Sequence, residues 1–296
     1  MKIALFSDVH GRLRVVLRLI RCWQMAHRTY LDGALIAGDL GCFPDLAKVD
    51  KATLRWMADD SEEAGFARFF VQPQAAVENM INMECGEFSD VRCPIYFIPG
   101  NHEDYDFLLA KRKASNDHTF PVDCYRRFQC IQDGAIIRLQ GQDGQSLRVA
   151  GIWGIENTAA NAPYKIDPDC IRQLEALGKD QMDVLLTHDA PAEAYPGGGS
   201  KLITRVIKAC EPSVHLFGHV HPIDGQCLFS LPGCRTTSFL LKNVSFGKTK
   251  AESLSGSLGL LDWDQCRARV SVAQDDWLKQ MRYCTWQQVW PGGTLA

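Results

Sequence analysis

The sequence predicts an α/β fold, and two observations support this prediction. Short, continuous apolar runs recur at 3–6, 34–37, 95–98, 184–186 and 214–217. Runs of this length bounded by Gly or Pro are typical of strands buried on both faces. Between the first two runs, apolar residues over 12–29 follow a helical period, which predicts a helix packed on the sheet. The 296 residues are within the range of one large α/β domain.

A polar motif follows each apolar run. The motifs are Asp8-Val9-His10, Gly38-Asp39, Gly100-Asn101-His102-Glu103, Thr187-His188 and Gly218-His219-Val220-His221. In open α/β sheets ligands gather beyond the carboxyl ends of the strands, so we expect the motifs to meet at one edge of the sheet. Apart from Glu103, they supply two carboxylates, one amide oxygen and five imidazoles, which is a ligand set suited to a two-metal hydrolytic centre.

The spacing within two motifs supports this expectation. Asp8 and His10, like His219 and His221, are separated by one residue. In an extended backbone such a pair lies on the same side of the strand. The small residues Gly38, Gly100 and Gly218 would let the backbone turn closely around an ion.

In this order the five motifs resemble the blocks DxH, GD, GNHE, an isolated H and GHxH of the calcineurin-like metallophosphoesterase superfamily. The resemblance extends from Met1 to about His221. It implies an αββα sandwich of two mixed sheets, here with a helical insertion. It also implies a metal-dependent phosphoric ester hydrolase with two divalent or mixed-valence metal ions.

The resemblance further implies the roles of the motif residues. One metal would be held by Asp8, His10 and His221, the other by Asn101, His188 and His219, with Asp39 bridging both. A hydroxide between the metals would attack phosphorus in line, and His102 would protonate the leaving oxygen or stabilise the transition state, so that the catalytic residues are His102 and Asp39. Imidazole, carboxylate and amide ligands without thiolate favour Mn, Fe, Zn or Ni over a closed structural zinc site.

A weaker resemblance concerns the substrate. The helical insertion after Asp39 and the segment Gly151-Ile152-Trp153-Gly154-Ile155 are similar to the organisation of RNA lariat debranching enzymes. Those enzymes replace the first carboxylate of DxH with cysteine, whereas this chain keeps Asp8. The protein Ser/Thr phosphatases extend the second block to GDxxDRG, and this chain has neither that Asp nor that Arg.

We therefore expect a phosphodiesterase that acts on a nucleotide or nucleic-acid phosphodiester. Two alternatives stay open: a phosphomonoesterase or nucleotide pyrophosphatase that uses the same centre, and a non-catalytic scaffold on the same fold. Loss of His102 would abolish most turnover by an enzyme but would leave a scaffold intact.

The chain shows no repeat or composition break, which predicts a metallophosphoesterase domain over 1–274 and a C-terminal extension over 275–296. The insertion, about 43–92, is expected to be helical at 51–57, 62–71 and 74–83. Its aromatic residues would pack on the domain or line the substrate groove. Three roles are open for Trp277, Trp286 and Trp290: covering the core, forming a dimer contact, or closing over the substrate. The oligomeric state is not predicted.

Other segments have simpler interpretations. Helices are expected at 103–113 and at 201–210, the latter with Ser200 as N-cap. Strands are expected at 128–139 and 147–152 in a second sheet, which 226–230, 235–244, 256–263 and 267–273 would complete. The arginines of the first helix, Arg12, Arg14, Arg18 and Arg21, would form either a phosphate-facing stripe or a solvated face. The remaining histidines, His27, His118 and His215, are expected to be surface or packing residues.

Composition limits the partners and the compartment. A formal net charge of −3 gives no global attraction to nucleic acid or to an anionic membrane. The chain shows neither a secretory signal nor an apolar run of about 18 residues, so a cytoplasmic protein without membrane association is expected. Its twelve cysteines would then stay reduced and act mostly as small buried hydrophobes. Cys42, three residues past Asp39, is the candidate for an oxidation-sensitive thiol.

Overall fold

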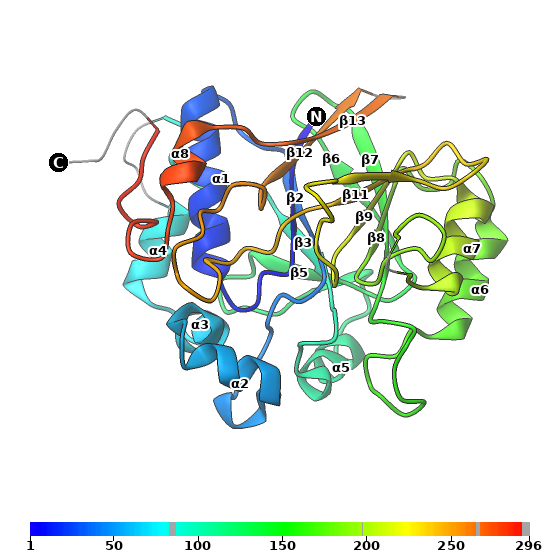
Figure 1. Ribbon diagram of the computed structural model, residues 1–296, viewed down its shortest axis with the longest axis horizontal. Coiled ribbons are helices and arrows are strands. Elements are labelled where there is room, and N and C mark those ends of the chain that lie inside the picture. Colours follow the sequence, from blue (N-terminus) through cyan, green and yellow to red (C-terminus); the bar gives the residue numbers. More distant parts are fainter. Residues whose placement is uncertain (83–86, 197, 265–266, 292–296) are drawn as a thin grey trace.

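The computed structural model describes residues 1–82, 87–196, 198–264 and 267–291. Two mixed sheets lie face to face, with helices α1, α4 and α8 on one side and α6 and α7 on the other (Figure 1). This arrangement confirms the predicted αββα sandwich. No helix in the described ranges is long and apolar enough to span a membrane.

The first sheet has seven strands in the order β13-β12-β1-β2-β3-β5-β4. Their bounds are β1 Lys2–Ser7, β2 Gly33–Ala37, β3 Ile95–Ile98, β4 Thr119–Pro121, β5 Phe128–Ile131, β12 Gly259–Asp264 and β13 Arg267–Val272. β1, β2 and β3 are parallel, and Ser7 pairs with Ala37, which in turn pairs with Ile98. Because these three strands end level with one another, the motifs that follow them begin side by side.

The second sheet has six strands in the order β10-β11-β9-β8-β7-β6. Their bounds are β6 Ile136–Gln140, β7 Ser146–Ile152, β8 Val184–Thr187, β9 Val214–Phe217, β10 Leu228–Ser230 and β11 Thr237–Leu240. β7, β8 and β9 are parallel, so Thr187 and Phe217 end at the same edge. Since β2 also contacts β8 across the sandwich, both sheets deliver their motifs to one place.

The helices are α1 Leu13–His27, α2 Lys51–Met57, α3 Gly65–Phe69, α4 Ala75–Asn82, α5 Tyr105–Lys113, α6 Pro168–Leu177, α7 Lys201–Cys210 and α8 Asp276–Gln280, with 3₁₀ turns η1 Leu46–Lys48 and η2 Ser61–Ala64. The side chain of Ser200 accepts a hydrogen bond from the backbone of Ile203 at the start of α7. The helix expected over 62–71 is divided between η2 and α3. Residue 83, at the end of the helix expected over 74–83, lies outside the described residues.

Two predictions of sheet membership were wrong. The single strand expected over 128–139 is broken at a turn containing Gly134, with φ of 72°, so that β5 joins the first sheet and β6 the second. The strands expected over 256–263 and 267–273 do not complete the second sheet, because β12 pairs antiparallel with β1 in the first. An alternating apolar pattern predicts a strand but does not specify which free edge the strand will join.

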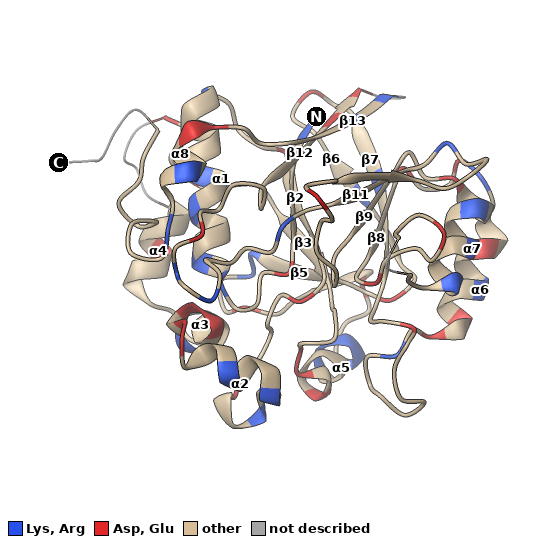
Figure 2. Ribbon diagram, in the orientation of Figure 1, with Lys and Arg blue, Asp and Glu red and all other residues tan. Residues whose placement is uncertain are grey.

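Both interpretations of the arginine stripe on α1 were also wrong. Arg12 and Arg14 form ion pairs with carboxylates of the insertion, which Figure 2 marks in red beside α3. Further along the helix, Arg18 donates hydrogen bonds to the backbone carbonyls of Gln287 and Val289. The stripe therefore binds the insertion at one end and the C-terminal tail at the other.

The tail covers the core. Trp277 and Trp286 are buried within the main apolar cluster, and the ring of Trp290 lies 3.5 Å from the guanidinium carbon of Arg18. Of the three roles that the sequence left open for these tryptophans, the contacts match the first.

Candidate metal centre

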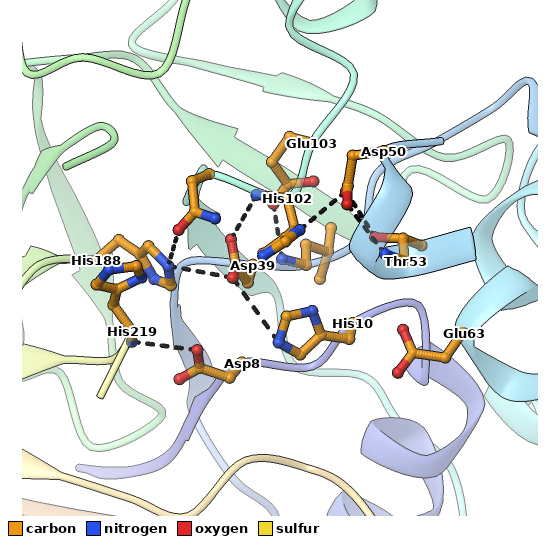
Figure 3. Close-up of polar contacts among 12 residues, drawn as sticks. Asp8, His10, Asp39, Asp50, Thr53, Glu63, His102, Glu103, His188 and His219 are labelled. Atoms are coloured by element: carbon orange, nitrogen blue, oxygen red, sulfur yellow. Dashed lines mark hydrogen bonds and ion pairs between the residues drawn. The ribbon is translucent and has the colours of Figure 1, made fainter. Parts of the chain in front are cut away.

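Asp8, His10 and Asp39 form the tightest cluster of potential metal ligands among the described residues. One ligand atom from each of these side chains lies within 4.8 Å of the others. Asp8 and His10 follow β1, and Asp39 follows β2 (Figure 3). Burial raises the pKa of Asp8 to about 6 and lowers the pKa of His10 to about 4. Both side chains therefore lie in a medium that disfavours their charged forms.

Asp39 belongs to this cluster and also contacts a second one, which contains His188 and Asn101. Its Oδ2 is 3.8 Å from Nε2 of His10 and 3.2 Å from Nε2 of His188, while its Oδ1 accepts a hydrogen bond of 2.8 Å from the backbone of His102. Burial alone would raise the pKa of Asp39, but the charge and hydrogen bond of His188, together with His10, hold it well below its ordinary value. This carboxylate faces both halves of the centre.

His188 completes the second cluster. Its Nδ1 lies 3.1 Å from the carbonyl oxygen of Ala37, which can only accept, so this nitrogen carries a proton. In a neutral imidazole Nε2 then presents a lone pair. That lone pair faces Oδ1 of Asn101 and Oδ2 of Asp39, each at 3.2 Å. A cation between these three atoms, either a proton or a metal ion, would satisfy their lone pairs.

The backbone at the strand ends differs from the expectation. Asp8, His10, Asp39 and His219 all have positive φ, between 46° and 66°. The prediction that an extended backbone places Asp8 and His10 on one side was therefore wrong in its reason, although the two side chains do meet. Left-handed residues at each strand end turn the chain sharply and aim successive side chains at one point.

Glycines make room for the ligands. A Cβ on Gly38, whose φ is 83°, would lie 2.0 Å from Nδ1 of His188. A Cβ on Gly218 would lie 2.5 Å from Oδ2 of Asp8. Any larger residue at these two positions would displace a candidate ligand.

His219 and His221 lie less close. The backbone N–H of His219 donates to Oδ1 of Asp8, and its ring centroid is 5.1 Å from that of His188. His221 is exposed and lines the same cavity as Asp8 and His10, but it is not part of their 4.8 Å cluster. The structure thus brings Asp8, His10, Asp39, Asn101 and His188 together, places the ring of His219 beside that of His188, and leaves His221 exposed in the same cavity.

The family model for calcineurin-like phosphoesterases matches residues 1–222, three quarters of the chain and every motif described above. The chain belongs to the calcineurin-like phosphoesterase family. Membership makes it a metal-dependent phosphoester hydrolase by class.

Solved structures align with this calcineurin-like phosphoesterase over most of its length. One aligns over 92% of this chain and 98% of its own, with a TM-score of 0.51 and 16% identity. Another, the protein TT1561 of Thermus thermophilus, aligns over the same fractions with a TM-score of 0.48 and 15% identity. The first similarity shows the fold alone. No curated protein matches the sequence of this chain.

Calcineurin-like phosphoesterases are typically dinuclear, and the residues present fit two cations. Among the described residues Oδ2 of Asp8 is buried and has no hydrogen-bond partner, which is costly unless a cation binds there. The three lone pairs at His188 provide a second such place. The Nδ1–H bond of His188 to a backbone carbonyl is the outer contact that fixes metal-binding histidines in orientation.

Sequence reasoning missed one residue of this phosphoesterase site. Asp50, at the N-terminus of α2, lies 2.9 Å from Nδ1 of His102 (Figure 3). Burial alone would lower the pKa of His102, but the bond to Asp50 and the charge of Asp39 raise it to about 9. The sequence Asp50-Lys51-Ala52-Thr53 could have indicated a helix cap, since Asp50 accepts from the backbone of Thr53. Nothing in that stretch of sequence could have indicated that Asp50 also contacts His102.

Other residues near the centre have supporting contacts. Glu103 accepts hydrogen bonds from the backbone of Leu40 and Cys42, and so fixes the loop that follows Asp39. The Cys42 side chain is buried, and burial raises its thiol pKa well above the ordinary value, which opposes the oxidation-sensitive role. His215 is buried between Thr187 and Ser238, at 2.7 and 3.1 Å.

The remaining two histidines lie outside the centre. His27 contacts Asp275 at 3.0 Å, and Nδ1 of His118 contacts the carbonyl of Ile136 at 3.0 Å.

Proposed function

We propose that this protein is a phosphodiesterase that hydrolyses a nucleotide or nucleic-acid phosphodiester. The observation that carries the proposal is the shape and charge of the cavity at the metal centre. The cavity has a volume of about 1090 Å³ and is lined by Asp8, His10 and Asp39 and by residues of the insertion and of the loop that follows β11. Small-molecule sites typically measure roughly 300 to 1,000 Å³, so a simple phosphate ester would leave much of this cavity empty.

The charge of the cavity also favours a diester. A phosphomonoester carries a second negative charge, which an additional arginine can bind in bidentate fashion. The arginine that lines this cavity among the described residues, Arg12, already donates to Asp60 at 2.8 Å and to Glu63 at 2.7 Å. Its charge is therefore largely neutralised, so Arg12 offers little to the second negative charge of a monoester.

The candidate ligands would hold the ions in two groups that share Asp39: Asp8, His10 and His221 on one side, and Asn101, His188 and His219 on the other. Bound there, two divalent ions supply a water of lowered pKa and stabilise the charge that develops on phosphorus. His102 holds a proton beside this centre, and Asp50 fixes its ring. We assign His102 the donation of a hydrogen bond or proton to the departing oxygen.

The test compares hydrolysis of bis-p-nitrophenyl phosphate and p-nitrophenyl phosphate by protein stripped of metal and reloaded with Mn. We expect higher kcat/KM for the diester. Asp39→Asn should lower it on the order of 10³-fold and reduce the bound metal, and His102→Ala should lower it about 10²-fold at unchanged metal content. His118→Ala, a histidine outside the centre, is the matched control. A preference for the monoester, or turnover that persists in Asp39→Asn, would contradict the proposal.

A further inference from the structure

The cavity has a second wall, formed by residues outside the motifs. One part comes from the insertion and includes Thr53, Trp56 and Glu63. The other part comes from the loop that follows β11, with Lys242, Ser245, Lys248, Thr249, Ser253 and Ser255 among its lining residues. Because these residues line the same cavity as His10 and His102, a substrate bound at the centre can extend onto this wall.

Trp56 and Lys248 face each other across the two parts of this wall. Trp56 lies on α2 and is half-buried, and Nζ of the exposed Lys248 is 5.6 Å from the centroid of the Trp56 ring. An aromatic ring beside an exposed ammonium group offers stacking and a positive charge at one point, as nucleic-acid-binding grooves do.

The charge of Lys248 is available for a ligand. Three lysines line the cavity. Lys242 lies 3.8 Å from a carboxylate oxygen of Glu252, and Lys279 lies 2.6 Å from one of Asp276. For Lys248 the described part of the chain provides no carboxylate within 4.0 Å. A bound anion would therefore compete with no ion pair at Lys248.

Hydrogen-bonding groups surround this pair. Hydroxyl side chains line the loop part of the wall. On the insertion part, Oε2 of Glu63 is buried and accepts no hydrogen bond from the residues that the structure describes. Figure 3 shows this carboxylate turned toward the side of His10. Such a lining suits the hydroxyl and amino groups of a nucleoside and is unfavourable for a lipid chain.

One helix, α2, links Trp56 to the metal centre. Asp50 caps α2 through the backbone of Ala52 and Thr53, and the same side chain contacts His102. Trp56 lies one turn further along α2. The backbone position of Trp56 is thus fixed relative to His102, the residue that would protonate the leaving group.

We propose that Trp56 and Lys248 form a subsite for the nucleotide unit next to the scissile phosphodiester, with the base against Trp56 and the neighbouring phosphate against Lys248. This inference rests on the proposed phosphodiesterase function and extends it. It assigns to the enzyme a substrate that has an aromatic base and a second phosphate beyond the one that reacts.

Three p-nitrophenyl diesters test the subsite: methyl p-nitrophenyl phosphate, the p-nitrophenyl ester of thymidine 5′-phosphate, and the 3′-phosphorylated form of that ester. We expect kcat/KM to rise along this series, mainly through KM. Trp56→Ala should lower the gain from the nucleoside about tenfold, and Trp56→Phe should keep most of it. Lys248→Gln should lower the gain from the 3′-phosphate about tenfold, and Lys248→Arg should keep it.

Lys250→Gln is the matched control, because Lys250 lies in the same loop but contacts the ring of Tyr283, at 4.6 Å. It should reproduce the wild-type series. The subsite is wrong if Trp56→Ala and Lys248→Gln keep the wild-type gains while all three diesters are hydrolysed.

If none of the diesters is hydrolysed, the proposed function fails, and the subsite is tested by binding alone. Calorimetric titration of thymidine 3′,5′-bisphosphate should then give a Kd about tenfold weaker for Trp56→Ala and for Lys248→Gln than for the wild type. Equal affinities would overturn the subsite.

Discussion

The two walls of the cavity are built on different principles. The wall that carries the candidate metal ligands consists of strand ends, where short motifs place Asp8, Asp39 and His188 in buried positions and the backbone makes left-handed turns. The opposite wall consists of an inserted helix and a long loop, whose lining residues form no motif. The comparison indicates that chemistry is placed on the sheets and recognition on segments added to them.

Arg12 joins the two walls. It follows His10 by two residues and is 3% exposed, and its guanidinium contacts Asp60 and Glu63 of the insertion. We call the wall of strand ends the chemical wall and the wall of the insertion and loop the recognition wall. Buried charges therefore fix the recognition wall to the chemical wall.

The largest effect is expected from Arg12→Ala. The variant leaves Asp60 and Glu63 buried without their cation, so the free energy of unfolding should fall by about 3 kcal/mol in urea denaturation. Arg14→Ala is the matched comparison, because its ion pair with Glu62 is more exposed, and it should cost about 1 kcal/mol. Equal losses would show that burial of the Arg12 pair is not what holds the insertion.

Gly218→Ala should separate chemistry from recognition. Its Cβ would lie 2.5 Å from Oδ2 of Asp8, so diester hydrolysis should fall about 10²-fold and metal content should decrease. Gly144→Ala has open space around it but a φ of 79°, which alanine adopts only with strain; it should lower stability yet keep its metal, and so separates backbone strain from displacement of Asp8. Full metal content in Gly218→Ala would show that Asp8 can move aside without loss.

Asp50→Asn should weaken the link between the walls. Asparagine can still cap α2 but places no negative charge beside His102, so the pKa of His102 should fall and kcat should decrease about tenfold. The pH profile of kcat checks this, because a purely structural role for Asp50 would lower kcat equally at all pH values. Asp45→Asn, which alters the exposed cap of η1, is the control.

The smallest effect concerns the pH dependence of stability. Burial raises the pKa of Glu63 from 4.5 to about 7, so the folded protein holds this proton more tightly than the unfolded chain. The free energy of unfolding should therefore fall as pH rises between these values. Glu63→Gln removes this titration, so its stability should not fall in this way and its advantage over the wild type should grow as pH rises across the window. If the free energy of unfolding changes with pH in the same way for both proteins, the raised pKa of Glu63 is contradicted.

The chemical wall could be predicted from the sequence, because parallel strands end at one edge and Asp8, Asp39 and His188 each follow such a strand. The reason given for Asp8 and His10 was nevertheless wrong, since their left-handed backbone is fixed by tertiary contacts. The partners of Arg12 and His102 could not be predicted, because Asp60 and Asp50 lie about fifty residues away in the chain. Nor does local pattern determine which sheet edge a strand will join.

That last limitation has a consequence for how the protein is made. β1, which ends at Ser7 just before Asp8, is bordered on one side by β2 and on the other by β12, where Lys2 pairs with Asp262. During synthesis one edge of β1 therefore stays unpaired until β12 has left the ribosome. Non-local pairing of this kind slows folding, and an open strand edge attracts other chains. We expect metal-binding competence to appear late, as one of the last steps of folding.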